Sequence, residues 1–147
     1  MQLAQLNIAL AKYPLESPEI SEFVDNLDAI NAIAESSEGF IWRLKDESGD
    51  ATNIKAFDDP KMIVNMSVWQ DVDCLKNFMF RTNHRNFMRR KAQWFEKLNT
   101  DSYVLWWIAD DHIPTIEEAL ARLAILRKDG DSPQAFTFKS NFTADDL

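Results

Sequence analysis

The chain has 147 residues, 46% of them hydrophobic and 12% aromatic, which is enough for one domain (1–147) to bury a core without disulfides. Its net charge of -8 opposes binding to a phosphate backbone, and no apolar stretch reaches the roughly 18 residues of a membrane-spanning helix. The single cysteine excludes a disulfide framework, so we expect a cytoplasmic protein that binds neither nucleic acid nor membrane.

The chain begins with an expected strand over residues 3–10, where even-numbered side chains are apolar and odd-numbered ones include Asn7. The Ser-Pro-Glu run at residues 17–19 is typical of a helix N-terminus. Apolar residues at helical spacing then continue to Ala34. We therefore expect one helix between this strand and Gly39.

Two further strands are expected before the middle of the chain. Residues 40–45 alternate in polarity and lead into the turn-forming sequence 46–50. Residues 52–57 suggest an irregular edge piece, and residues 62–69 form the clearest central strand. One face of that strand is apolar, whereas the opposite face carries a mixed group that includes Asn65, Ser67 and Trp69.

The run from Trp69 to Leu98 cannot be one continuous amphipathic helix, because its two halves place their apolar residues on opposite sides. We expect a first helix, a break near Thr82 and Asn83, and a second helix that continues to Leu98. The inward side of this second helix would carry a mixed stripe, formed by His84, Phe87, Met88, Lys91, Phe95 and Leu98.

Aromatic and β-branched residues at 103–108 predict a fourth strand, which completes a β-α-β-β-α-β order. Thr115 and Glu118 then form the pattern of a capping box, which begins an added helix that stops at Gly130. Residues 135–142 suggest an edge strand. The sequence therefore predicts an α+β fold, a ferredoxin-like sheet with an added C-terminal helix.

A four-stranded sheet with helices on one face leaves its other face uncovered. The apolar side chains at Leu6, Ile8, Val64 and Met66 are expected on that face. An exposed apolar surface of this size needs a partner, so we expect a homodimer formed by packing two such faces together.

His84 is the main candidate for catalysis. Its expected place in the first turn of a helix, on the buried side, favours a neutral imidazole that accepts a proton or binds a ligand. A core histidine bonded to a backbone carbonyl is an equally good interpretation. Asn7 would lie beside Asn65 on neighbouring strands, where the two amides either contact a ligand or satisfy each other.

Six residues are predicted to contact a substrate. Asn65 would orient its oxygen atoms, Trp69 and Phe87 would form walls, and an anion contact would come from the basic cluster between residues 81 and 91. A solvated helix face is the alternative for that cluster. The predicted substrate-binding residues are Asn65, Ser67, Trp69, Arg81, Phe87 and Lys91.

The chain resembles a bacterial family known as a domain of unknown function, which is grouped with dimeric α+β-barrel, antibiotic-biosynthesis-monooxygenase-like proteins. The resemblance runs from LAQLNIALAKYPLESPE through IVNMSVW, FRTNHRNFMRRKAQWF and YVLWWI to HIPTIEEALARL. The segment ending in FRTNH is also similar to haem-degrading monooxygenases of that superfamily. There Asn7 and His84 match the asparagine and the haem-ligating histidine, while Cys74 stands where those enzymes have tryptophan.

Three hypotheses follow. The first is a cofactor-independent, monooxygenase-like or isomerase-like enzyme for a small hydrophobic or aromatic substrate. In it His84 would act as base or hydrogen-bond donor, and Asn7 and Asn65 would orient the substrate. The second is haem binding or haem degradation, with His84 as the iron ligand. The third is a non-catalytic binding or regulatory module. No metal site other than the haem alternative is expected, because the chain has too few histidines.

Overall fold

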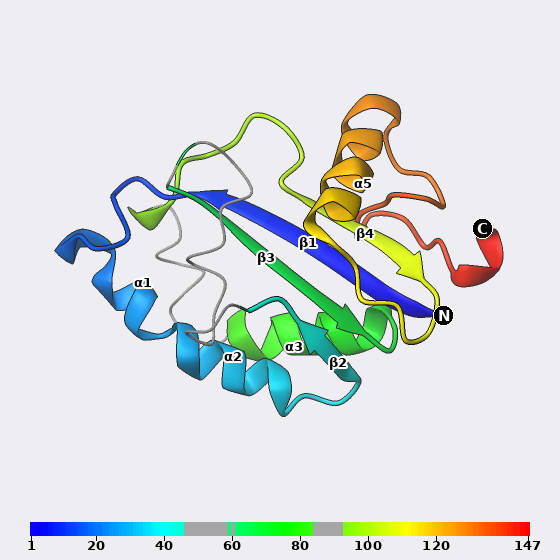
Figure 1. Ribbon diagram of the computed structural model, residues 1–147, viewed down its shortest axis with the longest axis horizontal. Coiled ribbons are helices and arrows are strands. Elements are labelled where there is room, and N and C mark those ends of the chain that lie inside the picture. Colours follow the sequence, from blue (N-terminus) through cyan, green and yellow to red (C-terminus); the bar gives the residue numbers. More distant parts are fainter. Residues whose placement is uncertain (46–58, 60, 84–92) are drawn as a thin grey trace.

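The computed structural model describes residues 1–45, 59, 61–83 and 93–147. Its centre is an antiparallel sheet in which the strands are ordered β2-β3-β1-β4 (Figure 1). This order is that of a ferredoxin-like fold, so the predicted α+β class is confirmed. The strands are β1 (Gln2–Leu10), β2 (Phe40–Arg43), β3 (Met62–Trp69) and β4 (Tyr103–Ile108).

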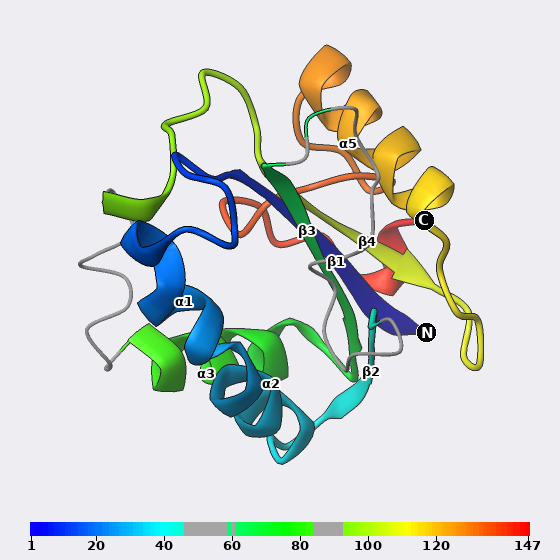
Figure 2. The same cartoon turned by 60° about the vertical axis from the view of Figure 1, so that its left-hand side comes forward.

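Helices lie on both faces of this sheet, as Figures 1 and 2 show. One face is covered by η1 (Pro18–Ile20), α1 (Ser21–Asp25), α2 (Leu27–Glu35) and α3 (Val72–Asn83). The opposite face carries α5 (Ile116–Asp129), and the short η2 (Ala144–Asp146) follows near the C-terminus. Among the described residues, no helix is long and apolar enough to cross a membrane.

The face under α5 is not open, which corrects the prediction of an uncovered sheet surface. Leu6, Val64 and Met66 are at most 5% exposed within a single chain. Leu123 and other apolar residues of α5 pack against this face and form one cluster with it. The sequence shows this helix clearly, but its pattern does not say on which side of the sheet the helix lies. The homodimer was predicted because this face was expected to be open, and that reason no longer holds.

The first helical region is interrupted, whereas the sequence predicted one helix. The break lies at Asn26, whose Nδ2 donates 2.7 Å to the backbone oxygen of Glu22 and ends α1. Ser17 does not act as a side-chain cap either, because its Oγ is buried without a hydrogen-bond partner. α1 and α2 are consequently short, with five and nine residues.

The segment after α3 also differs from the prediction where the structure describes it. α3 itself continues through Thr82 and Asn83. The expected second helix does not reach Leu98, because Phe95 forms an antiparallel bridge with Ala11 instead. Residues 84–92 lie outside the described part of the chain, as do the predicted turn at 46–50 and edge piece at 52–57.

The C-terminal part agrees better with the sequence. Thr115 accepts a hydrogen bond from the backbone of Glu118 at the start of α5, as its capping pattern predicted. The expected edge strand at 135–142 is reduced to a bridge between Phe136 and Leu105, formed by two backbone hydrogen bonds of 2.8 and 2.9 Å. This bridge covers the outer edge of β4.

Candidate functional site

A cavity of about 470 Å³ lies between the sheet and the helices α1, α2 and α3. Its floor comes from the odd-numbered residues of β1, β3 and β4, and its walls come from the short helices and the segments around residues 94 and 138. None of its described lining side chains is charged. The polar lining residues are Gln5, Asn7, Asn31, Asn65, Ser102 and Tyr103.

Asn7 and Asn65 form the polar centre of the floor. They are direct partners in the β1–β3 register, so the predicted proximity of the two amides is confirmed. Both side chains are exposed and line the cavity. Asn65 accepts a hydrogen bond from Gln5 through its Oδ1, and no bond joins the two asparagines in the described structure. The amide pair is therefore accessible to a ligand.

A chain of buried polar groups lies below this pair. Gln5 Nε2 donates to Asn65 Oδ1 and to Ser67 Oγ, each over 2.7 Å. The indole Nε1 of Trp69 donates to the same Ser67 oxygen over 2.8 Å. Ser67 therefore bonds to side chains inside the protein. It was predicted to contact a substrate, but it is not among the described residues that line the cavity.

Trp69 was predicted to form a wall of the pocket, but it lies elsewhere. The residue is 0% exposed and belongs to the packed core. Its ring stacks on Phe78 at a centroid distance of 5.0 Å and meets the edge of Phe40 at 5.5 Å. The walls next to the cavity come instead from Phe78 and from residues on α1 and α2, such as Phe23.

Arg81 was predicted, with Lys91, as a possible anion contact, but it is not among the described residues that line the cavity. Its side chain is exposed on α3, and Nη1 donates 3.1 Å to Ser37 Oγ in the turn after α2. The periodicity of α3 could not reveal this contact, because it depends on where a distant turn lies.

Three predicted site residues, His84, Phe87 and Lys91, lie outside the described residues. In the sequence His84 directly follows α3, and Phe78 and Met79 of that helix line the cavity. Haem binding through His84 stays a prediction. Within the described ranges, no group of three His, Cys, Asp or Glu side chains is arranged to hold a metal ion.

Sequence reasoning missed Gln5 as a functional residue. It shares the face of Asn7, two residues before it on β1, so strand alternation was the available signal. The contribution of Phe23, Ile30 and Asn31 to the walls had no such signal, because it depends on where the helices pack.

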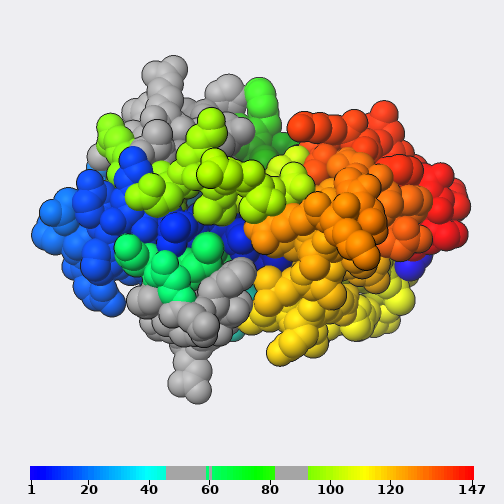
Figure 3. All heavy atoms as spheres, turned by 90° about the horizontal axis from the view of Figure 1, so that it is seen from above, coloured from blue at the N-terminus to red at the C-terminus, as the bar shows by residue number. Residues whose placement is uncertain are grey.

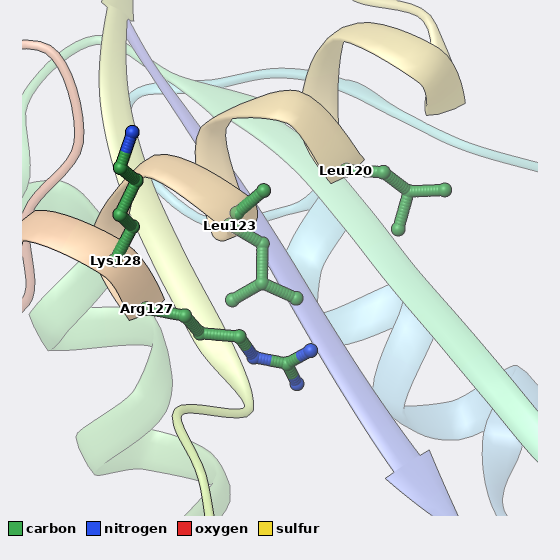
Figure 4. A pocket seen from close by; sticks show the side chains of 5 residues that line it. Leu120, Leu123, Arg127 and Lys128 are labelled. Carbon is green, nitrogen blue, oxygen red and sulfur yellow. The ribbon is translucent and has the colours of Figure 1, made fainter.

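A second hollow of about 500 Å³ lies beside α5 on the opposite face (Figures 3 and 4). It is lined by Leu120, Leu123, Ala124, Arg127 and Lys128. Leu120 and Leu123 point toward the strands, as the close-up shows. Arg127 donates two hydrogen bonds to the backbone oxygen of Asp101, so this guanidinium already has a partner. The hollow has no amide pair comparable to that of the first cavity.

Among the titratable groups outside the cavity, Cys74 and Glu118 have altered pKa values. Burial raises the pKa of the Cys74 thiol to about 11, assisted by a hydrogen bond with Asp71, so this thiol is neutral at physiological pH. Burial also tends to raise the pKa of Glu118. Hydrogen bonds from His112 and Trp106 outweigh that effect and lower it below its ordinary value. His112 thus has a structural partner in Glu118.

The sheet order and the cavity beside it define the protein as a ferredoxin-like α+β domain with a small-molecule-sized cavity. Over residues 2–147 the chain matches the family described as a domain of unknown function (DUF3291), and it belongs to that family. This confirms the family resemblance seen in the sequence. No curated protein matches the chain.

Solved structures add information on the fold alone. A protein of unknown function from Nitrosomonas europaea is 14% identical, with 78% of this chain and 95% of that chain covered and a TM-score of 0.50. A mutant of SnoaB, a cofactor-independent oxygenase from Streptomyces nogalater, is 15% identical, covers 78% and 98%, and has a TM-score of 0.49. The second similarity supports nothing about activity.

Proposed function

We propose that this protein binds a small, neutral, hydrophobic molecule in the cavity between its sheet and helices α1 to α3. One observation carries the proposal: two adjacent amides, Asn7 and Asn65, lie accessible on the floor of an otherwise largely apolar cavity. Apolar walls with a few convergent polar groups are typical of ligand sites. The cavity volume of about 470 Å³ fits a molecule of two or three fused rings.

The absence of charge among the described lining side chains favours a neutral ligand over an anion. A carboxylate or phosphate in such surroundings would lose its hydration without gaining a cationic partner. Aromatic side chains on two sides of the cavity, including Phe23 and Phe78, favour a flat ligand.

We further propose that the protein is an enzyme of the cofactor-independent, monooxygenase-like type, as the family resemblance in the sequence implies. His84 would accept a proton from an activated CH₂ group, and Asn7 and Asn65 would bind the oxygen atom that carries the resulting negative charge. The electron-rich carbanion would then reduce dioxygen. The balanced overall reaction is R₂CH₂ + O₂ → R₂C=O + H₂O, with both oxygen atoms supplied by dioxygen.

Anthrone is a suitable test substrate, because its CH₂ group is flanked by two rings and its product, anthraquinone, has a different absorption spectrum. We expect the purified protein to accelerate dioxygen uptake with anthrone above the spontaneous rate. Asn65→Ala and His84→Ala should each reduce this acceleration by about 10²-fold or more, the usual effect of losing an oxyanion donor or a general base.

Arg81→Ala is the matched control, because Arg81 was a predicted contact that does not line the cavity. This variant should keep the full rate. If anthrone binds but dioxygen uptake is not accelerated, the proposed enzymatic activity is contradicted and the protein is a binding module. A rate that is unaffected by Asn65→Ala would contradict the proposed site.

A further inference from the structure

We propose that Gln5 is a positioning residue that fixes the direction of the Asn65 amide, so that the cavity floor presents an N–H donor at this point. The ligand would then need an acceptor oxygen, such as a carbonyl, opposite Asn65. This inference rests on the proposed small-molecule site. It adds that Asn65, at the centre of that site, donates a hydrogen bond to the ligand. It is carried by the hydrogen bonds of three residues, Gln5, Ser67 and Trp69, and by their burial.

The series of hydrogen bonds begins at Trp69. An indole N–H only donates, so Ser67 Oγ has to accept the 2.8 Å bond from Trp69 Nε1. The indole cannot easily move away, because its ring is fully buried between Phe40 and Phe78. The packed core therefore supplies the fixed end of the chain.

Gln5 links Ser67 to the cavity floor. Its Nε2 has two hydrogens, and both are used, one on Ser67 Oγ and one on Asn65 Oδ1, each over 2.7 Å. Since Asn65 Oδ1 is occupied by Gln5, the other end of that amide, Nδ2, is the part left for a ligand. No hydrogen bond from Nδ2 occurs within the described structure.

Burial explains why the arrangement is held firmly. Gln5 is 8% exposed and Ser67 is 7% exposed, so neither side chain has ready access to water. Rotating the Gln5 amide away would leave buried polar atoms without partners, which is unfavourable. Asn65, by contrast, is exposed at the cavity surface and is the most accessible of these four hydrogen-bonded residues.

One other arrangement satisfies the same distances, and it predicts the opposite ligand. If the Gln5 and Asn65 amides were both turned by 180°, Ser67 would donate to Gln5 Oε1 and Asn65 would present its oxygen. The cavity would then select a hydrogen-bond donor. The polarity preferred by a bound probe distinguishes the two arrangements.

Three naphthalene probes of similar size provide this test. 2-Acetylnaphthalene carries only an acceptor, 2-isopropenylnaphthalene replaces that oxygen by CH₂, and 2-aminonaphthalene carries a donor. Dissociation constants are measured by titration calorimetry for the full chain and for Gln5→Met, which removes the directing amide. Gln2→Met is the matched control, since Gln2 is on the same strand but does not line the cavity.

We expect the preference for the ketone over the alkene to fall about five-fold in Gln5→Met and to stay unchanged in Gln2→Met, as the loss of one oriented hydrogen bond implies. If Gln5 had only a structural role, Gln5→Met would weaken the binding of all three probes by the same factor. Melting curves confirm that each variant is folded before it is titrated.

Gln5→Glu gives an independent result if the methionine variant does not fold. A carboxylate only accepts, so Ser67 and the Nδ2 of Asn65 would both donate to it, and the Asn65 oxygen would turn toward the cavity. The preference should then invert in favour of 2-aminonaphthalene.

The outcomes separate this inference from the proposed function. Binding of the probes with a preference for the amine in the unmodified protein, or with a ketone preference that survives both Gln5 variants, would overturn the role of Gln5 and leave the binding site intact. If no probe binds the unmodified protein, the proposed function is overturned and the inference fails with it.

Discussion

The two ends of the helix-covered sheet face differ although the same strands form both. At one end Leu3 and Trp69 pack against α3 and the C-terminal segment, and both are 0% exposed. At the other end the equivalent alternating positions carry Asn7 and Asn65, and a cavity remains. Side-chain size and polarity along a strand thus decide where a sheet face is filled and where it stays open.

The polar chain of Gln5, Ser67 and Trp69 lies between these two ends. It is anchored in the packed end and terminates at Asn65 in the open end. A rigid core can therefore orient a group that contacts a ligand, while the group itself contributes little to stability.

Trp69→Ala should destabilise the protein most, by about 3–5 kcal/mol, because it leaves a large buried cavity and removes the donor to Ser67. Asn65→Ala, at the open end, should cost less than about 1 kcal/mol, since its side chain is exposed. Urea denaturation of both variants measures the difference. Equal losses would contradict the division between a packed and an open end.

Gly39→Ala tests how little space the packed end has. Gly39 has a φ of +81°, and an added Cβ would collide with Cys74 Sγ on α3. We expect a loss of more than about 2 kcal/mol, of which the backbone conformation accounts for about 1–2 kcal/mol. Gly130→Ala is the control, because its φ of +75° is similar but nothing lies within 4 Å of its Cβ. Similar melting temperatures for the two variants would argue against tight packing.

Ala9→Leu adds carbon atoms at the open end instead. The cavity has room for them, so the free energy of unfolding should change by less than about 1 kcal/mol, whereas overpacking a filled core costs about 1–3 kcal/mol. The same substitution should abolish binding of 2-acetylnaphthalene by occupying the site. A stable variant that still binds this probe would place the ligand elsewhere.

The smallest effect concerns Glu118, on the opposite face of the sheet. Its folded-state pKa lies below the ordinary value of 4.5, so its stabilising effect is complete above that pH and disappears as the pH falls through the folded-state pKa. Glu118→Gln should lower the melting temperature at pH 7 by a few degrees and reduce the loss of stability on acidification. Glu117→Gln, an exposed neighbour, should change neither quantity, and neither variant should alter probe binding.

Much of the fold could be predicted from sequence periodicity. The alternation in β1 and β3 correctly assigned both strands and brought Asn7 beside Asn65, because antiparallel neighbours in a ferredoxin-like order have little freedom of register. The side on which α5 packs could not be predicted, since an amphipathic stripe shows that a helix buries one side but not against which sheet face.

Of the candidate site, the sequence predicted only the floor, which is formed by strand residues such as Asn7 and Asn65. Strand alternation places Asn65 and Trp69 on the same face, but it does not tell that α3 covers one of them and leaves the other open. The contact of Arg81 with Ser37 likewise depends on packing between segments far apart in the sequence. The interruption at Asn26, which shortens the helices that wall the cavity, arises from a local side-chain bond that competes with the helix.

The most direct test of the central claim is a two-dimensional ¹H–¹⁵N NMR titration of the protein with 2-acetylnaphthalene. We predict that the largest shifts occur at the side-chain amides of Asn7 and Asn65 and at the backbone amides of Phe78 and Met79, which line the cavity. Shifts confined to α5 around Leu120 would place the ligand in the hollow on the opposite face and contradict the account.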